Sequence, residues 1–104
     1  MSRRLTFTAV SVLDAIAAGA QYGFDIMDRT GLPSGTVYPA LSRFERDGLV
    51  RSGWENARLA RQEKRPPRRY YEITAEGARV LADMRARVRA LTRGRLRRPS
   101  PARG

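Results

Sequence analysis

The sequence predicts a mainly α-helical fold with one small antiparallel β-hairpin. Apolar residues recur at helical spacing through residues 8–47, and they do so again after residue 74. Between these regions, two short segments of β-type composition flank a polar stretch that contains Pro66 and Pro67. The predicted order is therefore three helices, a hairpin and a final helix.

The first two helices are predicted over residues 8–18 and 22–29. In the first, Thr8 is the expected N-cap, and Gly19 follows the last turn. The second helix is short and ends before a Thr-Gly-Leu-Pro sequence, which breaks helical structure. One face of the first helix is apolar, and it consists of Val10, Leu13 and Ala17.

Residues 34–47 are predicted to form a third helix with two different faces. Ser34 is the expected N-cap, and Gly48 is expected to end the helix in a left-handed conformation. Pro39 lacks an N–H donor and clashes with the preceding turn, so we expect a distorted helix start but no break. The buried stripe, spaced i, i+4 and i+7, consists of Val37, Leu41 and Phe44. The opposite face consists of Ser34, Thr36, Tyr38, Ser42, Arg43 and Arg46.

Residues 49–55 and 70–73 are predicted to be the two strands of the hairpin. Alternation along the second strand places Tyr71 and Ile73 on its buried face. The connection, residues 56–69, is expected to be a polar loop in which Glu63 is the single acid. Its basic residues are Arg58, Arg61, Lys64, Arg65, Arg68 and Arg69. The sequence thus predicts a hairpin with a long, positively charged tip.

A final helix is predicted over residues 74–92, with Thr74 as its N-cap. Its apolar stripe has coiled-coil-like spacing and consists of Leu81, Met84, Val88 and Leu91. A single helix after a completed domain needs a partner for such a stripe, so we expect dimerisation; packing on its own domain is the alternative. We interpret residues 1–73 as one domain, 74–92 as a dimerisation helix and 93–104 as a basic, disordered tail.

The composition excludes several classes of function. The chain of 104 residues contains neither Cys nor His, which removes thiolate, imidazole and disulfide chemistry. No pair of carboxylates and no nucleophile with a neighbouring base stands at a useful spacing. We therefore expect no enzyme, no metal and no cofactor. Since no apolar run is long enough to span a bilayer, we expect a cytoplasmic location.

The net charge of +11 lies entirely in the second half of the chain. From Arg51 onward there are 16 basic residues and five acids, whereas residues 1–48 carry five of each. Such an excess favours a polyanionic partner, because phosphates that are neutralised release counterions. A membrane surface can use the same charge, and a bias toward arginine can also reflect nucleotide composition.

Three helices followed by a hairpin with a basic tip are the arrangement of a winged helix-turn-helix. In it the third helix enters the major groove of duplex DNA, and the hairpin, or wing, lies on the backbone. The third helix is expected to contact DNA through Ser34, Gly35, Thr36, Tyr38, Pro39, Ser42, Arg43 and Arg46. The wing is expected to bind phosphates through Arg58, Arg61, Lys64, Arg65, Arg68 and Arg69. Non-specific nucleic-acid binding, a protein-interaction module and an ordinary solvated surface are the alternatives.

Three sequence blocks resemble the PadR-like transcriptional regulators. They are Tyr22-Gly23-Phe24-Asp25-Ile26, the run from Gly35 to Glu45 that leads to Gly48-Leu49-Val50, and the run from Arg69 to Gly77. The blocks occur in the order and spacing of that family within residues 5–92. The resemblance implies a homodimeric repressor that reads a palindromic operator with its third helix. It also implies dimerisation through the C-terminal helix and often the first helix, and it accounts for Pro39, where the family commonly has a proline.

The single C-terminal helix resembles the short subfamily of these regulators. Some relatives sense phenolic acids or flat aromatic drugs, and Trp54 and Tyr70 are the candidates here for contacting a small-molecule effector or lining an interface. No aromatic residue follows Tyr71, which argues against an effector pocket at the dimer interface. Duplex DNA and a second copy of the chain are therefore the expected partners, with a nucleoid-associated location.

Overall fold

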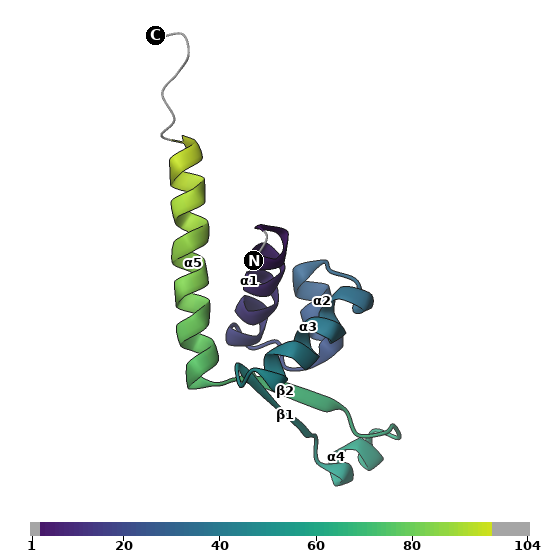
Figure 1. The fold of residues 1–104 in the computed structure, drawn as a ribbon. Helices are drawn as coiled ribbons and strands as arrows, with labels where there is room; N and C mark the ends of the chain where they lie inside the picture. The colour runs from purple at the N-terminus through teal and green to yellow at the C-terminus, as the bar shows by residue number, and fades with distance from the viewer. Residues whose placement is uncertain (1–2, 97–104) are drawn as a thin grey trace, which may run out of the picture.

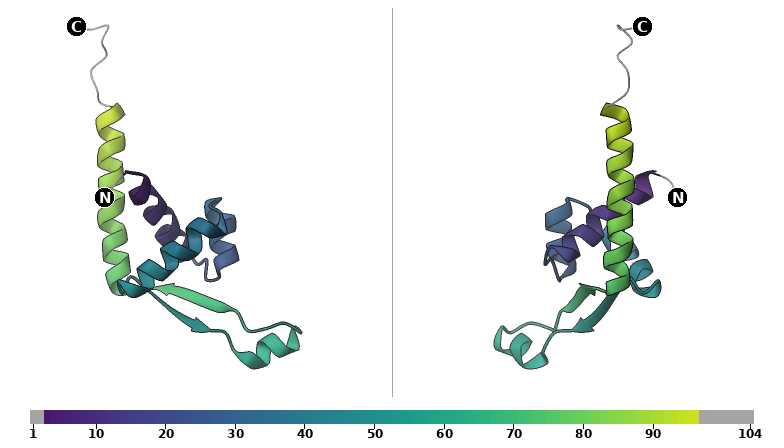
Figure 2. Two further views of the ribbon diagram at one scale, coloured as in Figure 1. Left: turned by 45° about the vertical axis from the view of Figure 1, so that its right-hand side comes forward. Right: turned by 90° about the vertical axis from the view of Figure 1, so that its left-hand side faces the viewer.

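The computed structural model describes the backbone of residues 3–96 and the side chains of residues 7–93. Helices α1 to α3 pack together, the β1–β2 hairpin projects from them as a wing, and α5 runs beside α1 (Figure 1 and Figure 2). The prediction of a mainly helical fold with an antiparallel hairpin is confirmed. The elements are α1 (Arg3–Ala17), α2 (Gly23–Thr30), α3 (Ser34–Arg46), β1 (Val50–Trp54), α4 (Ala57–Gln62), β2 (Arg69–Ile73) and α5 (Ala75–Leu96).

The core forms where the first three helices meet. Leu13 of α1, Ile26 of α2 and Leu41 of α3 are each at most 1% exposed. Burying each of these side chains contributes about 1.5–3 kcal/mol to folding. The predicted stripe of α3 lies in this core, since Val37 and Phe44 are buried together with Leu41. The core therefore fixes which face of α3 remains exposed.

One predicted helix start and one predicted N-cap are wrong. Helix α1 begins at Arg3, so Thr8 lies inside it; no glycine or proline stands before Thr8 to stop the helix. The N-cap of α3 is Pro33, and Ser34 is the first helical residue without a capping side-chain bond. The carbonyl of Pro33 accepts hydrogen bonds from the N–H groups of Thr36 and Val37, at 2.9 and 3.0 Å. Backbone groups thus replace the expected hydroxyl cap.

Helix α3 runs unbroken through Pro39, as predicted. The bond that Pro39 cannot donate would have gone to the carbonyl of Gly35, and Gly35 is exposed to water. The helix ends at Arg46, and Gly48 just beyond its C-cap has a φ of 77°, the left-handed conformation that glycine adopts at low cost. The N–H of Leu49 donates to the carbonyl of Phe44 at 2.8 Å and closes the terminus. The chain then turns directly into the wing.

The two strands of the wing are antiparallel, with Val50 opposite Ile73 and Trp54 opposite Arg69. Tyr71 is buried and Ile73 packs against the core, which confirms the predicted inner face. The N–H of Tyr71 donates to the carbonyl of Gln21 at 2.8 Å. The connection between α1 and α2 thus pairs with β2 and holds the wing against the helices.

The connection predicted as a polar loop contains the short helix α4, so that prediction is wrong for residues 57–62. Asn56 caps the helix, because its Oδ1 accepts a hydrogen bond from the N–H of Arg58 at 2.7 Å. Within the helix, Ala60 is completely buried. After the last turn, Lys64 takes a left-handed conformation with a φ of 56°. The tip of the wing is therefore a capped helical turn.

Helix α5 begins where it meets the end of α3, the start of β1 and the end of β2. Thr74 is its N-cap, as predicted: the N–H of Gly77 donates to Thr74 Oγ1 at 2.9 Å. The N–H of Thr74 donates to the carbonyl of Leu49 at 3.0 Å, which links the end of β2 to the start of β1. A Cβ atom on Gly77 would stand 2.0 Å from that Leu49 oxygen. This close approach of two backbones requires glycine.

The apolar stripe of α5 is divided between two environments. Leu81 and Met84 are buried in the protomer's own core, where α5 packs on α1. Val88 is half-buried, and Leu91 is 40% exposed. The prediction that all four residues await a partner is therefore corrected for Leu81 and Met84. The predicted helix end at residue 92 is also wrong, because α5 continues to Leu96; residues 97–104 of the predicted tail lie outside the described residues.

Gly77→Ala is expected to lower the free energy of unfolding by about 1–3 kcal/mol, because the methyl group overlaps the Leu49 carbonyl. Urea denaturation followed by circular dichroism measures the change. Gly35→Ala is the matched control: nothing lies within 4 Å of the added Cβ, and alanine favours the helix by about 0.5–1 kcal/mol. Equal effects of the two substitutions would contradict the close approach at Gly77.

Candidate nucleic-acid interface

The outer face of α3 is open to solvent along the whole helix. Thr36 and Arg43 are half-buried at the margins of this face. Its exposed residues are Ser34, Gly35, Tyr38, Pro39, Ser42 and Arg46. The eight positions that the sequence assigned to DNA contact thus share one accessible face, opposite the core.

The ring of Tyr38 lies against the start of α2. A Cβ atom on Gly23 would stand 2.2 Å from the Tyr38 hydroxyl, so the ring in this position lies directly against the Gly23 backbone. One side of the ring is supported in this way, and the side chain is still 45% exposed. Tyr38 therefore packs one side of its ring on α2 and leaves the rest accessible at the surface of α3.

Glu45 of α3 connects the helix to the wing. Its Oε2 accepts a hydrogen bond from Ser52 Oγ at 2.6 Å and lies 3.4 Å from Arg69 Nη2. Arg69 Nη2 also donates to Ser52 Oγ at 2.7 Å, and its guanidinium lies 5.3 Å from the centre of the Trp54 ring. Arg69, predicted as a phosphate ligand, is thus engaged in contacts that hold the wing beside α3.

A buried carboxylate, Glu55, organises the tip of the wing. It accepts two hydrogen bonds from the Arg65 guanidinium, one from the N–H of Arg68 at 3.0 Å and one from the Tyr22 hydroxyl at 3.3 Å. Arg65 lowers the pKa of Glu55 from 4.5 to about 2, against the opposite effect of burial. Burial, together with the charge of Glu55, raises the pKa of Tyr22. The network joins the wing to the start of α2.

The assignment of Arg65 to phosphate binding is corrected by this network. Its side chain is only 18% exposed, and its second nitrogen also pairs with Glu63 at 3.1 Å. A guanidinium that satisfies two carboxylates has few donors left for a phosphate. Arg65 is therefore a structural residue of the wing.

Arg68 stays exposed but rests on an aromatic pair. The rings of Tyr22 and Phe24 are stacked, with centres 5.7 Å apart and planes within 4°. The Arg68 guanidinium lies 4.9 Å from the centre of the Phe24 ring. Its charge is thus held above α2, on the side that faces the wing.

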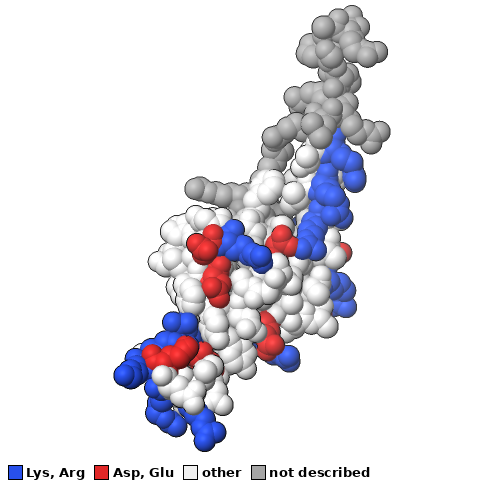
Figure 3. Space-filling model, turned by 180° about the vertical axis from the view of Figure 1, so that it is seen from behind, with Lys and Arg blue, Asp and Glu red and all other residues white. Residues whose placement is uncertain are grey.

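Four basic residues of the wing are exposed without an ion pair among the described residues: Arg58, Arg61, Lys64 and Arg68. Two of them project from α4, which the Glu55 network fixes in place. Figure 3 shows basic side chains gathered at the end of the wing and again along α5. The wing therefore offers charge that its own acids do not neutralise.

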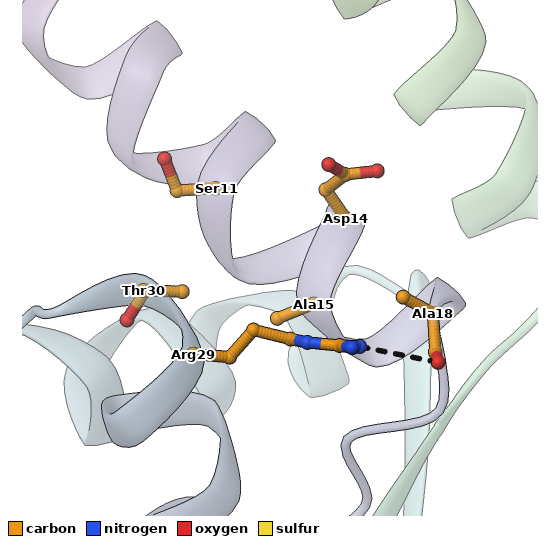
Figure 4. Close-up of a pocket in the computed structure, with 6 residues that line it drawn as sticks. All are labelled: Ser11, Asp14, Ala15, Ala18, Arg29 and Thr30. Atoms are coloured by element: carbon orange, nitrogen blue, oxygen red, sulfur yellow. Dashed lines mark hydrogen bonds between the residues drawn. The ribbon is translucent and has the colours of Figure 1, made fainter.

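The two candidate effector contacts, Trp54 and Tyr70, lie on the strands of the wing. Trp54 is 64% exposed at the end of β1, and the ring of Tyr70 lies across Gly53. One hollow of about 390 Å³ lies elsewhere, between α1 and α2 (Figure 4). There Arg29 Nη1 donates to the carbonyl of Ala18 at 3.2 Å, and Asp14 pairs with Arg85 of α5. The polar side chains of that hollow serve helix packing, and no aromatic residue lines it.

Sequence reasoning missed Glu55, Tyr22 and Glu45. Each acts through partners at least seven residues away along the chain, so no local pattern reveals the contact. A local signal did exist for α4: Asn56 precedes a run of good helix formers, as an N-cap does. That signal predicts that the tip of the wing is structured. In a structured tip, some of the arginines lie close enough to acidic side chains of the same chain to be neutralised by them.

The helical core, the exposed third helix and the basic wing define a winged helix-turn-helix protein. Residues 12–83 match the model of the PadR-like family of transcriptional regulators. The chain therefore belongs to the PadR-like family and is a DNA-binding transcriptional regulator. No curated protein matches the sequence.

Solved structures of similar fold support the assignment. A PadR family regulator from Clostridium difficile R20291 is 25% identical, with a TM-score of 0.72 over 84% of this chain and 92% of that one. One from Eggerthella lenta is 29% identical, with a TM-score of 0.68 over 88% and 80% of the two chains. A PadR-like transcription factor from Bacteroides fragilis shares the fold at 24% identity, with a TM-score of 0.71 over 86% and 87%.

Glu55→Gln is expected to loosen the wing, because the amide cannot replace the charge-assisted bonds to Arg65. Hydrogen exchange of the α4 amides should become faster, whereas that of α1 should not change. Folding lowers the pKa of Glu55, so the carboxylate stabilises the wing above about pH 4.5, and this effect disappears as the pH falls toward 2. The variant should lack that acid-dependent step.

Glu63→Gln is the control for this prediction, because the Glu63 side chain is exposed and its ion pair among the described residues is with Arg65 alone. It should leave the exchange of α4 nearly unchanged. Equal protection of α4 in Glu55→Gln and in the unsubstituted protein would show that the buried carboxylate does not hold the wing.

Proposed function

We propose that this regulator is a repressor that binds a palindromic operator as a homodimer, with α3 in the major groove and the wing on the backbone. The observation that carries this proposal is the accessible polar face of α3, held through Glu45 and Ser52 beside a wing with unneutralised charge. Winged regulators place these two surfaces on adjacent parts of the duplex.

In this proposal, α3 reads base edges through its exposed polar face. A helix is about 10–12 Å across and the major groove is about 12 Å wide, so only the outer face reaches the bases. Small residues at the start of α3, Ser34, Gly35 and Thr36, allow the backbone to approach closely. Tyr38, Arg43 and Arg46 supply longer side chains, Ser42 adds a short hydroxyl, and Pro39 lies on the same exposed face.

The wing supplies affinity and register more than sequence choice. Arg58, Arg61, Lys64 and Arg68 are its phosphate ligands in this proposal, since their charged groups are exposed. Arg69 is not counted among these ligands, because its guanidinium links Glu45 of α3 to Ser52 of β1. Because the Glu55 network fixes α4, the wing meets the backbone as a preformed surface.

Dimerisation through α5 is supported by the apolar residues that the protomer leaves uncovered. Leu91 of α5 and Phe7 of α1 are 40% and 46% exposed, and Val88 is half-buried. The dimer interface proposed here therefore uses the C-terminal half of α5 together with α1, and Leu81 and Met84 support it from within. A two-fold dimer requires half-sites about one helical turn apart.

None of the described helices is long and apolar enough to cross a lipid bilayer. A cytoplasmic, nucleoid-associated location is part of the proposal, because it is where the operator would be. The family and the solved structures of similar fold are transcription regulators and not enzymes.

Arg43→Ala is expected to weaken binding to the operator by about 1–3 kcal/mol while changing binding to random duplex little, if Arg43 reads a base. Arg58→Gln with Arg61→Gln should weaken both about equally and reduce the slope of log K against log salt by about 0.9 for each phosphate that is no longer neutralised. Genomic binding with sequencing supplies the operator, and fluorescence anisotropy at several salt concentrations measures affinity.

Arg79→Ala is the control, since Arg79 is an exposed arginine of α5 that pairs only with Glu76 among the described residues. It should leave both affinities nearly unchanged. Equal losses on operator and random DNA for Arg43→Ala would favour a non-specific binder. Absence of DNA binding at low salt would favour a protein-interaction module instead.

Leu91→Glu is expected to convert the dimer to monomers, because it places a charge in the proposed apolar contact. Sedimentation equilibrium should show about half the mass of the unsubstituted protein. Leu59→Glu, at an exposed leucine of α4, is the matched control and should leave the mass unchanged. A dimeric Leu91→Glu protein would place the interface elsewhere.

A further inference from the structure

Helix α5 carries a basic surface that the proposed DNA-binding face does not include. After Asp83 the sequence contains eight arginines and no acid up to residue 104. In the described part of this segment, Arg89 and Arg93 are exposed. Figure 3 shows the corresponding band of basic side chains along the helix.

Arg85, Arg89 and Arg93 are four residues apart and therefore share one face of α5. Arg85 pairs with Asp14 of α1, which neutralises the lower end of this row. Arg89 and Arg93 form no ion pair within the part of the chain that the structure describes. Like charges at this spacing destabilise a helix, and a bound polyanion removes that cost.

The position of Arg89 and Arg93 separates them from both proposed interfaces. The wing and the C-terminal end of α5 project in different directions from the helical core (Figure 1 and Figure 2). Successive residues of a helix are turned by about 100°, so both arginines point about 100° or more away from Val88 and Leu91. A dimer contact through those apolar residues leaves the two arginines accessible.

We propose that Arg89 and Arg93 form a second, sequence-independent surface for the phosphate backbone of duplex DNA, away from α3 and the wing. This inference rests on the proposed function, since it adds contacts to a protein already bound to DNA. A guanidinium binds phosphate oxygens through paired donors, and the two side chains start about 6 Å apart along the helix. The surface adds affinity without reading bases.

The composition of α5 favours duplex DNA over other polyanions. No aromatic residue follows Tyr71, so the helix has no ring on which the bases of a single strand can stack. For the same reason it lacks the aromatic anchors typical of helices that lie in a membrane interface. Charge at regular spacing is what remains, and the duplex backbone presents one phosphate per about 1.7 Å of axis.

The test uses the full chain with Arg89→Gln and Arg93→Gln, and with Arg89→Lys and Arg93→Lys as the charge-preserving control. Binding to a long random duplex is measured across salt concentrations. The Gln variant should reduce the salt slope by up to about 1.8 per protomer, at about 0.9 for each neutralised phosphate, and the Lys variant should retain it. Sedimentation without DNA should give equal masses for all three proteins.

An unchanged slope in the Gln variant overturns the second surface but not the proposed function, which the wing variant tests separately. A protein that binds no DNA overturns both. If the double variant misfolds by circular dichroism, Arg89→Gln and Arg93→Gln are made singly, and each should reduce the slope by about 0.9. Binding of polyglutamate or anionic phosphatidylglycerol vesicles that disappears in the variant while DNA binding persists would also overturn the proposal.

Discussion

The Leu49 carbonyl is the point on which the arrangement of this protein depends. It accepts from Thr74 at the end of β2, and it lies so close to Gly77 that no side chain fits there. Leu49 lies in the short segment between α3 and β1. One peptide group therefore connects the end of α3 and the start of β1 to the end of β2 and the start of α5. In the proposed function α3 and the wing bind one duplex, so DNA binding depends on the relative orientation of these two elements.

The arginines of this chain have different tasks, and net charge alone does not separate them. Arg65 and Arg69 hold the wing, and Arg85 ties α5 to α1 through Asp14. Others, such as Arg58 and Arg61, are exposed without an ion pair among the described residues. Burying a carboxylate such as Glu55 requires a cation beside it, so part of the basic excess is neutralised internally. The basic residues that are not neutralised in this way determine the electrostatic potential around the protein.

The sequence was sufficient for features that depend on local pattern. The order of elements, the buried stripe of α3 and the Thr74 cap follow from spacing and from the chemistry of single residues. Helix α4 was missed because six residues are too few to show periodicity, and its stability comes from the cap and from burial of Ala60. Leu81 and Met84 were assigned to a partner because only the three-dimensional structure shows that α1 covers them.

The left-handed backbone of Lys64 has a cost that glycine would avoid. For residues other than glycine this conformation costs roughly 1–2 kcal/mol, and the last turn of a helix is where glycine commonly relieves it. A cation therefore occupies the outermost bend of the hairpin although an uncharged residue would fit the backbone better. Strained backbone conformations of this kind are concentrated at functional sites of proteins. Lys64 thus lowers the folding stability of the wing slightly, and it places an ammonium group at the outermost point of the hairpin, where a partner molecule can contact it.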